Sequence, residues 1–376
     1  MSRLRSIVCV IGTRPEAIKM APVVATLRAC GWARCVVVAT AQHRDLLDQM
    51  LDRLDVPVDH DLDMMTDGQT SAELVARMLP AIDRVLEHEH ADVVLAQGDT
   101  TTVFVAGLAA FHRRIPFGHV EAGLRTHDLA QPFPEEGYRQ MVARIARWHF
   151  APTKGAAVNL RQEGVPEGLI HVTGNTGIDT LLQTVRKLEP APGRDARIIL
   201  LTAHRRESFG QPLQRIFSAV RELVERHADV RVVYPVHPNP NVHAAAHTML
   251  GGHERIELRA PIDYFEFVAL MRSAYLVLTD SGGIQEEAPA LAKPVLVLRE
   301  QTERPEAIEA GVARLIGTQQ ADIIDAASRL LDDPAEYAAM ALGASPYGDG
   351  HAAERIVELL RKEAPGPESA DVHEHA

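Results

Sequence analysis

Short apolar runs rich in β-branched residues alternate along this chain with longer amphipathic stretches, and this alternation most constrains the fold. The clearest early runs are Ile7 to Ile11, Cys35 to Ala39, Val93 to Ala96 and Phe117 to Val120. Because these runs are apolar nearly throughout, they predict parallel strands that are buried on both faces. Parallel neighbours need crossover connections, which the amphipathic stretches supply as helices.

The same pattern restarts in the second half of the chain. Its predicted strands are Ile198 to Leu201, Val230 to Tyr234, Ile256 to Leu258, Leu276 to Leu278 and Val295 to Leu298. A chain of 376 residues is too long for one ordinary core. We therefore expect an α/β protein with two doubly wound parallel-sheet, Rossmann-like domains that face each other across a cleft. The Pro/Gly-rich segment Glu189 to Asp195 is the clearest break in composition, although a further predicted strand, Ile170 to Thr173, and the helix after it could belong to either side.

The charge balance and the cysteines exclude several classes of protein. A net charge of -12 argues against binding to nucleic acid or to an anionic membrane surface. Three cysteines without a C-x-x-C pair predict neither a disulfide framework nor a zinc knuckle. The first apolar run is too short for a signal peptide, and no run approaches the roughly 18 apolar residues of a membrane span. We expect a cytoplasmic protein with a disordered tail over the last dozen residues.

Four predicted strands end abruptly in polar turns that contain glycine. Open parallel sheets bind ligands beyond the carboxyl ends of their strands, so these turns are the candidate site. They are Gly12 to Glu16, Gly98 to Thr102, Glu121 to Arg125, and Thr279 to Gly283.

The turn Ser281, Gly282 and Gly283 opens a predicted helix and has the properties of a phosphate cradle, although a simple helix N-cap is the alternative. It matches neither a Walker A loop nor the G-x-G-x-x-G of dinucleotide enzymes, so no NAD or ATP is indicated. Glu287, one turn into this helix, is placed to bind ribose hydroxyl groups, or merely to complement the helix dipole.

Cations follow other strands. Arg14 and Lys19 form a candidate anion-binding lip after the first strand. His204, beside Arg205, follows the first strand of the second half, where it resembles an anion clamp, although a lone histidine is often structural. His237 occupies the corresponding place one strand later.

Carboxylates gather at the same predicted edge of the first sheet. Several acids at one edge can provide a general acid and a general base with separated pKa values, although each acid could also form an ordinary cap or ion pair. Arg125 and Arg139 could tune them by charge. The candidate acids are Asp99, Glu121, and Glu135 or Glu136. The histidine runs at Glu87 to His90 and His373 to His375 have the wrong spacing for a metal site, and no metal is predicted.

Together these segments resemble the non-hydrolysing UDP-N-acetylglucosamine 2-epimerases. The resemblance runs from Ile7 to about Arg361. Its blocks are GTRPEAIKMAP (Gly12 to Pro22), TAQHR (Thr40 to Arg44), QGDTTT (Gln97 to Thr102), GHVEAGLRT (Gly118 to Thr126), PFPEE (Pro132 to Glu136), TGNT (Thr173 to Thr176), HRRESFG (His204 to Gly210), YPVHPNP (Tyr234 to Pro240), LTDSGGIQEEAP (Leu278 to Pro289) and TERPEA (Thr302 to Ala307).

The resemblance implies the glycosyltransferase-B fold and a homodimer. It implies an N-terminal domain over residues 1–170, a UDP-binding domain over 171–355, and a last segment, 356–376, whose helix returns to the first domain before the tail. The implied activity is reversible interconversion of UDP-N-acetylglucosamine and UDP-N-acetylmannosamine without a cofactor. UDP leaves to give a 2-acetamidoglucal and then adds back.

The resemblance also implies roles for individual residues. As catalytic residues it implies Asp99, Glu121, Glu135, Arg139 and His204. As ligands of UDP or the sugar it implies Arg14, Lys19, Phe267, Ser281, Gly282, Gly283, Glu287 and Arg304. Positions that hold a second, activating UDP-N-acetylglucosamine in bacterial members correspond to Gln42, Arg44, Gln69, Glu136, Arg205 and His237. Asp45 and Gly68 depart from that pattern, and Ile262 stands where some members have a uracil-contacting Gln.

Three other activities stay open at this point. A hydrolysing 2-epimerase would release N-acetylmannosamine and free UDP, a glycosyltransferase of the same fold would need an acceptor, and a nucleotide-sugar sensor would not react. The chain is too short to include the kinase domain that often accompanies the hydrolysing type.

Overall fold

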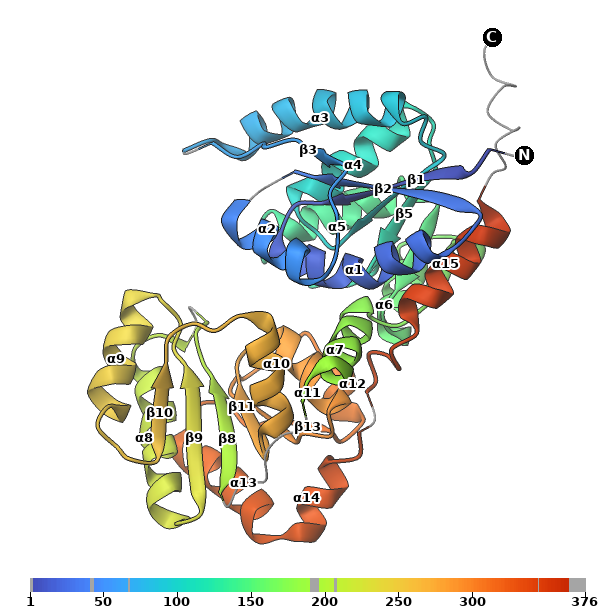
Figure 1. Cartoon of the computed structure of the whole chain (residues 1–376). Coiled ribbons are helices and arrows are strands. Elements are labelled where there is room, and N and C mark those ends of the chain that lie inside the picture. The colour runs from blue at the N-terminus through green and yellow to red at the C-terminus, as the bar shows by residue number, and fades with distance from the viewer. Residues whose placement is uncertain are drawn as a thin grey trace. The chain divides into compact units, whose positions relative to one another are not determined.

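A computed structural model of the chain describes residues 3–40, 44–66, 68–189, 196–205, 208–343 and 345–364. The chain forms two compact units (Figure 1). The first consists of Met1–Thr180 and Gly348–Ala376, and the second of Leu181–Tyr347. The division falls within helix α7 (Thr176–Lys187). Most of the predicted linker and the predicted tail lie outside the described residues.

The first unit is built on a parallel sheet in the order β3-β2-β1-β4-β5-β6-β7. Cys9 of β1 pairs with Val37 of β2 on one side and with Leu95 of β4 on the other. The strands are β1 (Arg5–Ile11), β2 (Ala33–Ala39), β3 (His60–Asp61), β4 (Val93–Gln97), β5 (Phe117–Val120), β6 (Trp148–Ala151) and β7 (Ile170–Val172).

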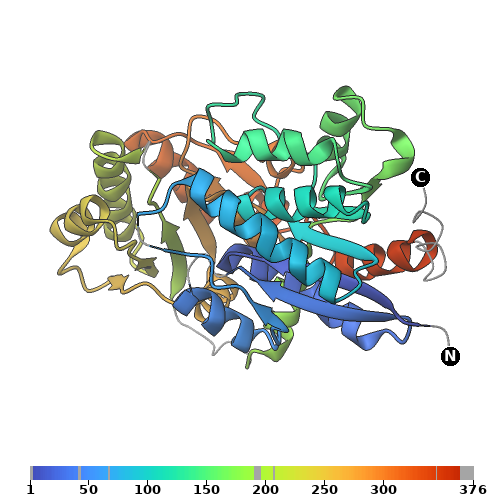
Figure 2. The same ribbon diagram turned by 90° about the horizontal axis from the view of Figure 1, so that it is seen from above.

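Helices cover both faces of this sheet. Helix α4 packs on one face with α3 beside it, and α1 packs on the opposite face (Figures 1 and 2). The layer under α3 and α4 is an apolar core that includes Val8, Val94 and Met78. The helices before α7 are α1 (Arg14–Ala29), α2 (Arg44–Arg53), α3 (Ser71–His88), α4 (Thr101–His112), α5 (Glu135–Ala143), α6 (Lys154–Gln162) and the short 3-10 helix η1 (Glu167–Leu169).

The last helix, α15 (Ala352–Glu363), belongs to the first unit, where it packs against α1. Asp179 of α7 accepts hydrogen bonds from the backbone N–H groups of Ala352 and Ala353, at 3.2 and 2.8 Å. At the other end of α15, Glu363 accepts a hydrogen bond of 2.9 Å from the indole of Trp148. Both ends of α15 are therefore tied to elements that lie far away in the sequence.

The second unit has its own parallel sheet in the order β10-β9-β8-β11-β12-β13, and a separate apolar core that includes Phe217 and Tyr234. Its strands are β8 (Arg197–Thr202), β9 (Val230–Pro235), β10 (Ile256–Arg259), β11 (Leu276–Thr279), β12 (Val295–Val297) and β13 (Ala313–Leu315). Its helices after α7 are α8 (Gln211–Arg226), α9 (Pro240–Leu250), α10 (Tyr264–Ser273), α11 (Gly282–Ala290), α12 (Pro305–Glu309), α13 (Gln320–Asp332) and α14 (Pro334–Met340).

Each sheet changes direction of winding beside its first strand, and this fixes where ligands can bind. β1 lies between β2 and β4, and β8 lies between β9 and β11. Crossovers diverge from these pairs, and open parallel sheets bind ligands beyond the carboxyl ends of their strands at such a point. The loops after β1 and β4 therefore meet in the first unit, and the loops after β8 and β11 meet in the second.

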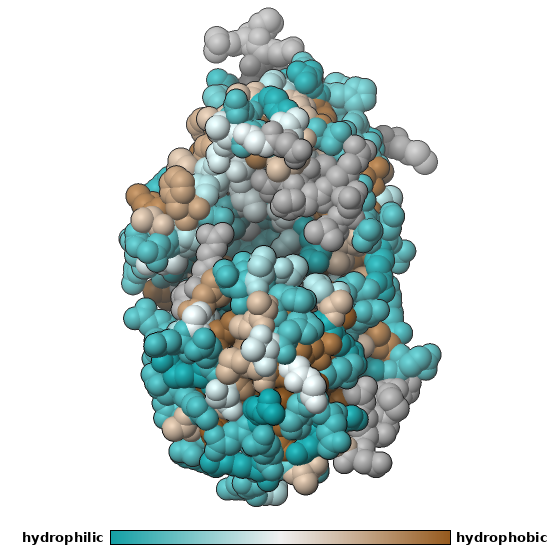
Figure 3. Space-filling model, turned by 90° about the vertical axis from the view of Figure 1, so that its left-hand side faces the viewer, coloured by the Kyte–Doolittle hydropathy of each residue, from teal (hydrophilic) through white to brown (hydrophobic). Residues whose placement is uncertain are grey.

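The predicted fold class, two doubly wound parallel sheets, is confirmed. Strands β3, β6 and β13 were not predicted. On the face of the molecule drawn in Figure 3, hydrophilic residues predominate and apolar residues form only small areas. Among the described residues, no helix combines the length and the apolar character needed to cross a membrane.

Candidate active site

The loop after β1 is closed by a capping box. The hydroxyl of Thr13 accepts a hydrogen bond from the backbone N–H of Glu16, at 3.4 Å. The Glu16 carboxylate in turn accepts from the N–H groups of Gly12 and Thr13, at 2.5 and 3.3 Å. This arrangement fixes the start of α1 at Arg14. The Arg14 side chain is exposed and has no hydrogen bond or ion pair with the described residues.

Glu16 also ties this loop to the loop after β4. The hydroxyl of Thr100 donates a hydrogen bond of 2.7 Å to the other carboxylate oxygen of Glu16. The Glu16 carboxyl group is buried, and burial raises its pKa to about 7, against the hydrogen bonds that lower it. The two loops also touch at Gly12, where a Cβ would overlap the hydroxyl of Thr102. This role of Glu16 was not predicted, although the T-x-x-E spacing signals a capping box.

Asp99 follows β4 directly after Gly98, which has a φ of +94°. Its carboxylate oxygen Oδ2 lies 2.8 Å from Nε and 2.7 Å from Nη2 of Arg139 on α5. Arg139 is the cation that the sequence analysis placed beside the acids. Two contacts to one oxygen hold the Asp99 carboxylate in a fixed direction.

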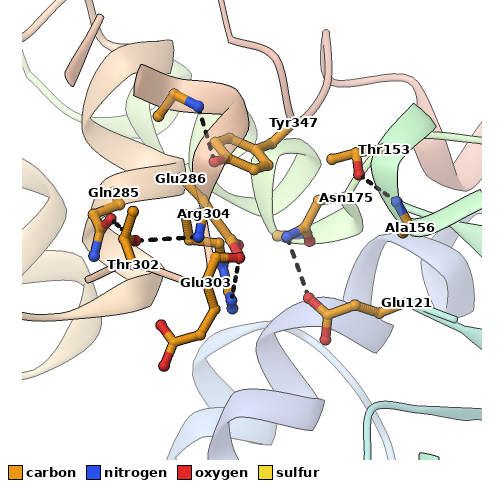
Figure 4. A network of polar contacts seen from close by, with 12 residues as sticks. Glu121, Thr153, Ala156, Asn175, Gln285, Glu286, Thr302, Glu303, Arg304 and Tyr347 are labelled. Carbon is orange, nitrogen blue, oxygen red and sulfur yellow. Dashed lines mark hydrogen bonds and ion pairs between the residues drawn. The ribbon is translucent and has the colours of Figure 1, made fainter. Parts of the chain in front are cut away.

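Glu121 follows β5 and has a φ of +64°, a left-handed conformation that few non-glycine residues adopt. Its carboxylate is almost buried and has three donors: the ammonium of Lys19, the amide of Gln97, and the amide of Asn175 at 3.3 Å. Figure 4 shows the contact with Asn175. Lys19, which was predicted to bind the anion of a ligand, is thus paired with a predicted acid. Gln97 and Asn175 were not singled out, although both lie in the motif blocks.

Glu135 and Glu136 begin α5 but have different surroundings. Glu136 is fully buried and accepts hydrogen bonds from the N–H of Thr126 and from the Gln140 amide, at 3.1 and 2.9 Å. Burial opposes ionisation of Glu136, but these donors and the guanidinium of Arg139 outweigh it, so that its pKa is lowered. One oxygen of Glu135 is buried without a partner among the described residues.

Arg125 is not available to tune the acids as the sequence analysis expected. Its guanidinium is buried and pairs with Glu163 through two hydrogen bonds of 2.6 and 2.8 Å. Behind the acids, the buried ring of His119 lies 2.7 Å from the carbonyl oxygen of Gly98. Burial lowers the pKa of His119 to about 4, so the ring is neutral and donates this hydrogen bond to the Asp99 loop.

In the second unit, the loops after β8 and β11 meet at Asp280. Asp280 is fully buried, and its oxygen Oδ2 accepts hydrogen bonds from the N–H groups of His204 and Arg205, at 2.8 and 2.9 Å. The ring of His204 stacks on the ring of His237, with centroids 5.1 Å apart and planes 8° apart. Nδ1 of His237 accepts a hydrogen bond from the N–H of Asn239, which fixes the second ring.

The turn after β11 opens α11 in the way that an anion site requires. Ser281 occupies the N-cap position, but its side chain makes no capping hydrogen bond. A Cβ on Gly282 would lie 3.7 Å from Nη2 of Arg205 and from Nη2 of Arg304. Two guanidinium groups therefore flank the N-terminus of α11, where the helix dipole also favours negative charge.

The loop that carries Arg304 is fastened to α11 (Figure 4). Arg304 forms an ion pair with Glu286, which is itself buried. The hydroxyl of Thr302 donates a hydrogen bond of 2.6 Å to Gln285 and accepts one of 3.1 Å from the N–H of Arg304. Arg304 is thus held in place before any ligand binds.

The predicted ribose and uracil contacts lie on neighbouring helices. Glu287 is half-buried on α11, and Phe267 is half-buried on α10. Burial, and secondly the charge of Glu287, raise the pKa of Tyr264 well above its usual value. The carboxylate of Glu287 therefore lies close to the first residue of α10.

The residues predicted for a second nucleotide sugar are only partly described. Gln42 lies outside the described residues, and Arg44 begins α2 with its side chain outside them. Gln69 is half-buried and contacts Arg77 and Thr66. Arg205 and His237 lie at the His204 loop, and Glu136 is buried as described above. Among the described residues, no group of three or more His, Cys, Asp or Glu could hold a metal ion.

The chain is similar in sequence to proteins of one known family. The family described as UDP-N-acetylglucosamine 2-epimerase matches residues 25–361. The UDP-N-acetylglucosamine 2-epimerase of Yersinia pestis is 49% identical over 368 residues, 94% of this chain and 98% of that protein. The enzyme of the same name from Bacillus subtilis (strain 168) is 48% identical over 375 residues, 97% of this chain and 98% of that protein.

A solved structure of a UDP-GlcNAc 2-epimerase has a similar fold. The UDP-GlcNAc 2-epimerase of Neisseria meningitidis, bound to UDP-GlcNAc, superimposes with a TM-score of 0.87 at 42% identity. The match covers 95% of this chain and 100% of that one.

Proposed function

The chain belongs to the UDP-N-acetylglucosamine 2-epimerase family of isomerases, and we propose that it interconverts UDP-N-acetylglucosamine and UDP-N-acetylmannosamine without hydrolysing them. The observation that carries the proposal is the set of carboxylates at the ends of β4 and β5 and the start of α5. Two of them, Asp99 and Glu121, are held by cations, and one oxygen of Glu135 has no partner among the described residues.

The reaction explains why several acids are needed. The C2–H of the sugar has no adjacent carbonyl group to accept charge, so the C1–O bond to UDP must break first. The oxocarbenium-like centre acidifies C2–H, a carboxylate takes the proton, and a 2-acetamidoglucal remains. A proton delivered to the opposite face of C2, followed by return of the UDP oxygen to C1, gives the epimer. Two proton-transfer groups on different faces are therefore required.

We assign Asp99, Glu121 and Glu135 as these groups, and Arg139 as the cation that holds Asp99. A carboxylate that already has fixed donors is held in one direction, as a base must be. A carboxyl group with a free oxygen can exchange a proton with the substrate. Glu135 fits the second description, and Asp99 and Glu121 fit the first.

We assign the grip on UDP to Arg14 and Lys19 in the first unit, and to His204, the Ser281–Gly283 turn and Arg304 in the second. Glu287 then binds ribose, and Phe267 contacts the base. The uncapped hydroxyl of Ser281 and the two guanidinium groups beside Gly282 support this assignment. Positive charge here stabilises UDP as it leaves, where negative charge develops. Lys19, paired with Glu121, would contact both the acid and the diphosphate.

The remaining assignments follow from the family. We propose a cytoplasmic homodimer, residues 1–170 and 171–355 as its domains with 356–376 returning to the first, and Gln42, Arg44, Gln69, Glu136, Arg205 and His237 as ligands of an activating second UDP-N-acetylglucosamine. The three free thiols suit a reducing compartment.

Incubation with UDP-N-acetylglucosamine in heavy water tests the function. An epimerase incorporates deuterium at C2 of the sugar and produces UDP-N-acetylmannosamine, with no acceptor present and no net release of UDP. Accumulation of free UDP and N-acetylmannosamine would identify the hydrolysing reaction instead. A glycosyltransferase or a sensor would leave C2 unlabelled, and that result would refute the proposal.

A further inference from the structure

Asp280 is a buried acid at the end of β11 that the proposed reaction does not yet use. One of its oxygens, Oδ2, is fully occupied: it accepts from the N–H groups of His204 and Arg205, and from the Ser208 hydroxyl at 3.4 Å. These contacts join the loop after β8 to the loop after β11. A purely structural role for Asp280 would be satisfied by this one oxygen.

The other oxygen, Oδ1, is buried and has no hydrogen-bond partner among the described residues. It faces Nδ1 of the His204 ring at a distance of 3.7 Å. An unpaired buried oxygen is costly, and such a group often takes its partner only when a ligand binds. Hydrogen bonds of this kind are often long in unliganded sites and shorten in the complex.

We propose that Asp280 is a positioning residue for His204: its oxygen Oδ1 holds the proton on Nδ1, so that His204 becomes an imidazolium facing the diphosphate when UDP binds. The inference rests on the proposed function, in which His204 contacts the diphosphate. Because Oδ1 can only accept, the nitrogen that faces it must carry the proton. Nε2 is then the nitrogen left for the phosphate oxygens, and it takes up its proton from solvent.

Of the charged and titratable groups around His204, Asp280 is the one that favours the protonated ring. Burial lowers the pKa of His204, and the neighbouring His237 and Arg205 lower it further, while the charge of Asp280 raises it. His237 contributes in a second way, because its stacked ring fixes the plane in which His204 can turn. The unliganded ring is therefore neutral at pH 7, and the negative charges of UDP and Asp280 together allow it to protonate.

Proton uptake on UDP binding tests this directly. Calorimetric titration of UDP at pH 7, in two buffers with different ionisation enthalpies, gives the number of protons taken up. We expect net uptake by the native protein and none by the His204→Asn variant. We expect Asp280→Asn to lose most of the uptake and to bind UDP about 10- to 100-fold more weakly at pH 7. The difference in UDP affinity between Asp280→Asn and the native protein should become smaller toward pH 5.5, where solvent protonates the His204 ring.

Ser208→Ala is the matched control. It removes a hydrogen bond to Oδ2 of Asp280 and leaves Oδ1 unchanged, so it should take up protons as the native protein does. Unchanged uptake in Asp280→Asn, or an equal loss in Ser208→Ala, would overturn the proposal. The readout uses UDP alone and needs no turnover, so it is independent of the heavy-water test of the reaction.

The native protein provides a second test that needs no folded Asp280 variant. In two-bond 1H–15N spectra, with His204→Asn used for assignment, His204 should carry its proton on Nδ1 when free. Both nitrogens should be protonated in the UDP complex. A free ring with the proton on Nε2 would contradict the proposal.

Discussion

Two nitrogens of the Arg139 guanidinium contact a single oxygen of Asp99, at 2.8 Å from Nε and 2.7 Å from Nη2. The other oxygen of Asp99 makes no hydrogen bond or ion pair with the described residues. A carboxylate held in this way keeps a fixed direction, which a base needs.

Asp99→Asn should therefore reduce deuterium exchange at C2 by about 10²- to 10⁴-fold, the usual contribution of one proton-transfer group. UDP affinity, measured by calorimetry, should stay within about threefold, because Asp99 is not among the groups assigned to UDP. Arg139→Lys keeps the charge but loses the two-nitrogen contact. We expect its rate of deuterium exchange to lie between those of the native protein and Asp99→Asn. Full exchange in Asp99→Asn would remove Asp99 from the mechanism.

Glu121→Gln should cause a loss of exchange of the same order, about 10²- to 10⁴-fold, because the amide cannot take a proton from C2. The control is Glu163→Gln, an equivalent change in the same unit. Glu163 pairs with Arg125 and lies outside the proposed site, so this variant should lose thermal stability and keep exchange. Equal exchange in the two variants would contradict the assignment of Glu121.

Arg14→Ala and Arg125→Ala should separate a ligand-binding arginine from a structural one. Arg14 is exposed without a partner among the described residues, so its removal should change the free energy of unfolding by less than about 0.5 kcal/mol. We expect UDP binding to weaken at least tenfold. Arg125 is buried against Glu163, and its removal should cost about 3 kcal/mol of stability. Urea unfolding and UDP titration on both variants measure the two effects.

Glu16→Gln should change how stability depends on pH. Burial raises the pKa of Glu16 from 4.5 to about 7, so the folded chain binds this proton more tightly than the unfolded chain. The contribution of this group is therefore fully present below about pH 4.5 and is lost as the pH rises to about 7, by up to about 3 kcal/mol.

The glutamine variant has no such group. Its stability relative to the native protein, from urea unfolding between pH 4.5 and 8, should therefore rise with pH. Thr100→Val removes one hydrogen bond to Glu16 but keeps the carboxyl group, and its pH dependence should persist. A constant difference between Glu16→Gln and the native protein across this range would show that Glu16 does not titrate there.

The sequence predicted the strands whose apolar runs are uninterrupted, since burial on both faces leaves a plain signal. β5 was predicted with its observed ends, Phe117–Val120. β6, with the sequence WHFA, and β13, with ARL, were missed, because neither is a continuous β-branched run. β13 is the edge strand of its sheet, where polar side chains are easier to accommodate, whereas β6 is buried along its whole length between β5 and β7.

The places of the candidate residues in the fold were predictable, but their partners were not. Polar turns after parallel strands indicate the carboxyl edge of a sheet, and Asp99, Glu121 and Ser281 do follow strands β4, β5 and β11. Lys19 and Glu121 are 102 residues apart, and nothing local to either one predicts that they pair. The burial of Glu16 and Asp280 likewise depends on neighbouring loops that only the folded chain brings together.

Because α15 belongs to the first unit, the ribosome completes the second unit before the first. The second unit is continuous in sequence, so all of it has been made when Tyr347 is added. The first unit begins earlier but still lacks the helix that packs on α1 and the partner of Trp148. A nascent chain that extends only to Tyr347 would therefore contain the whole second unit but a first unit with an uncovered apolar surface, the kind of surface that chaperones and proteases recognise.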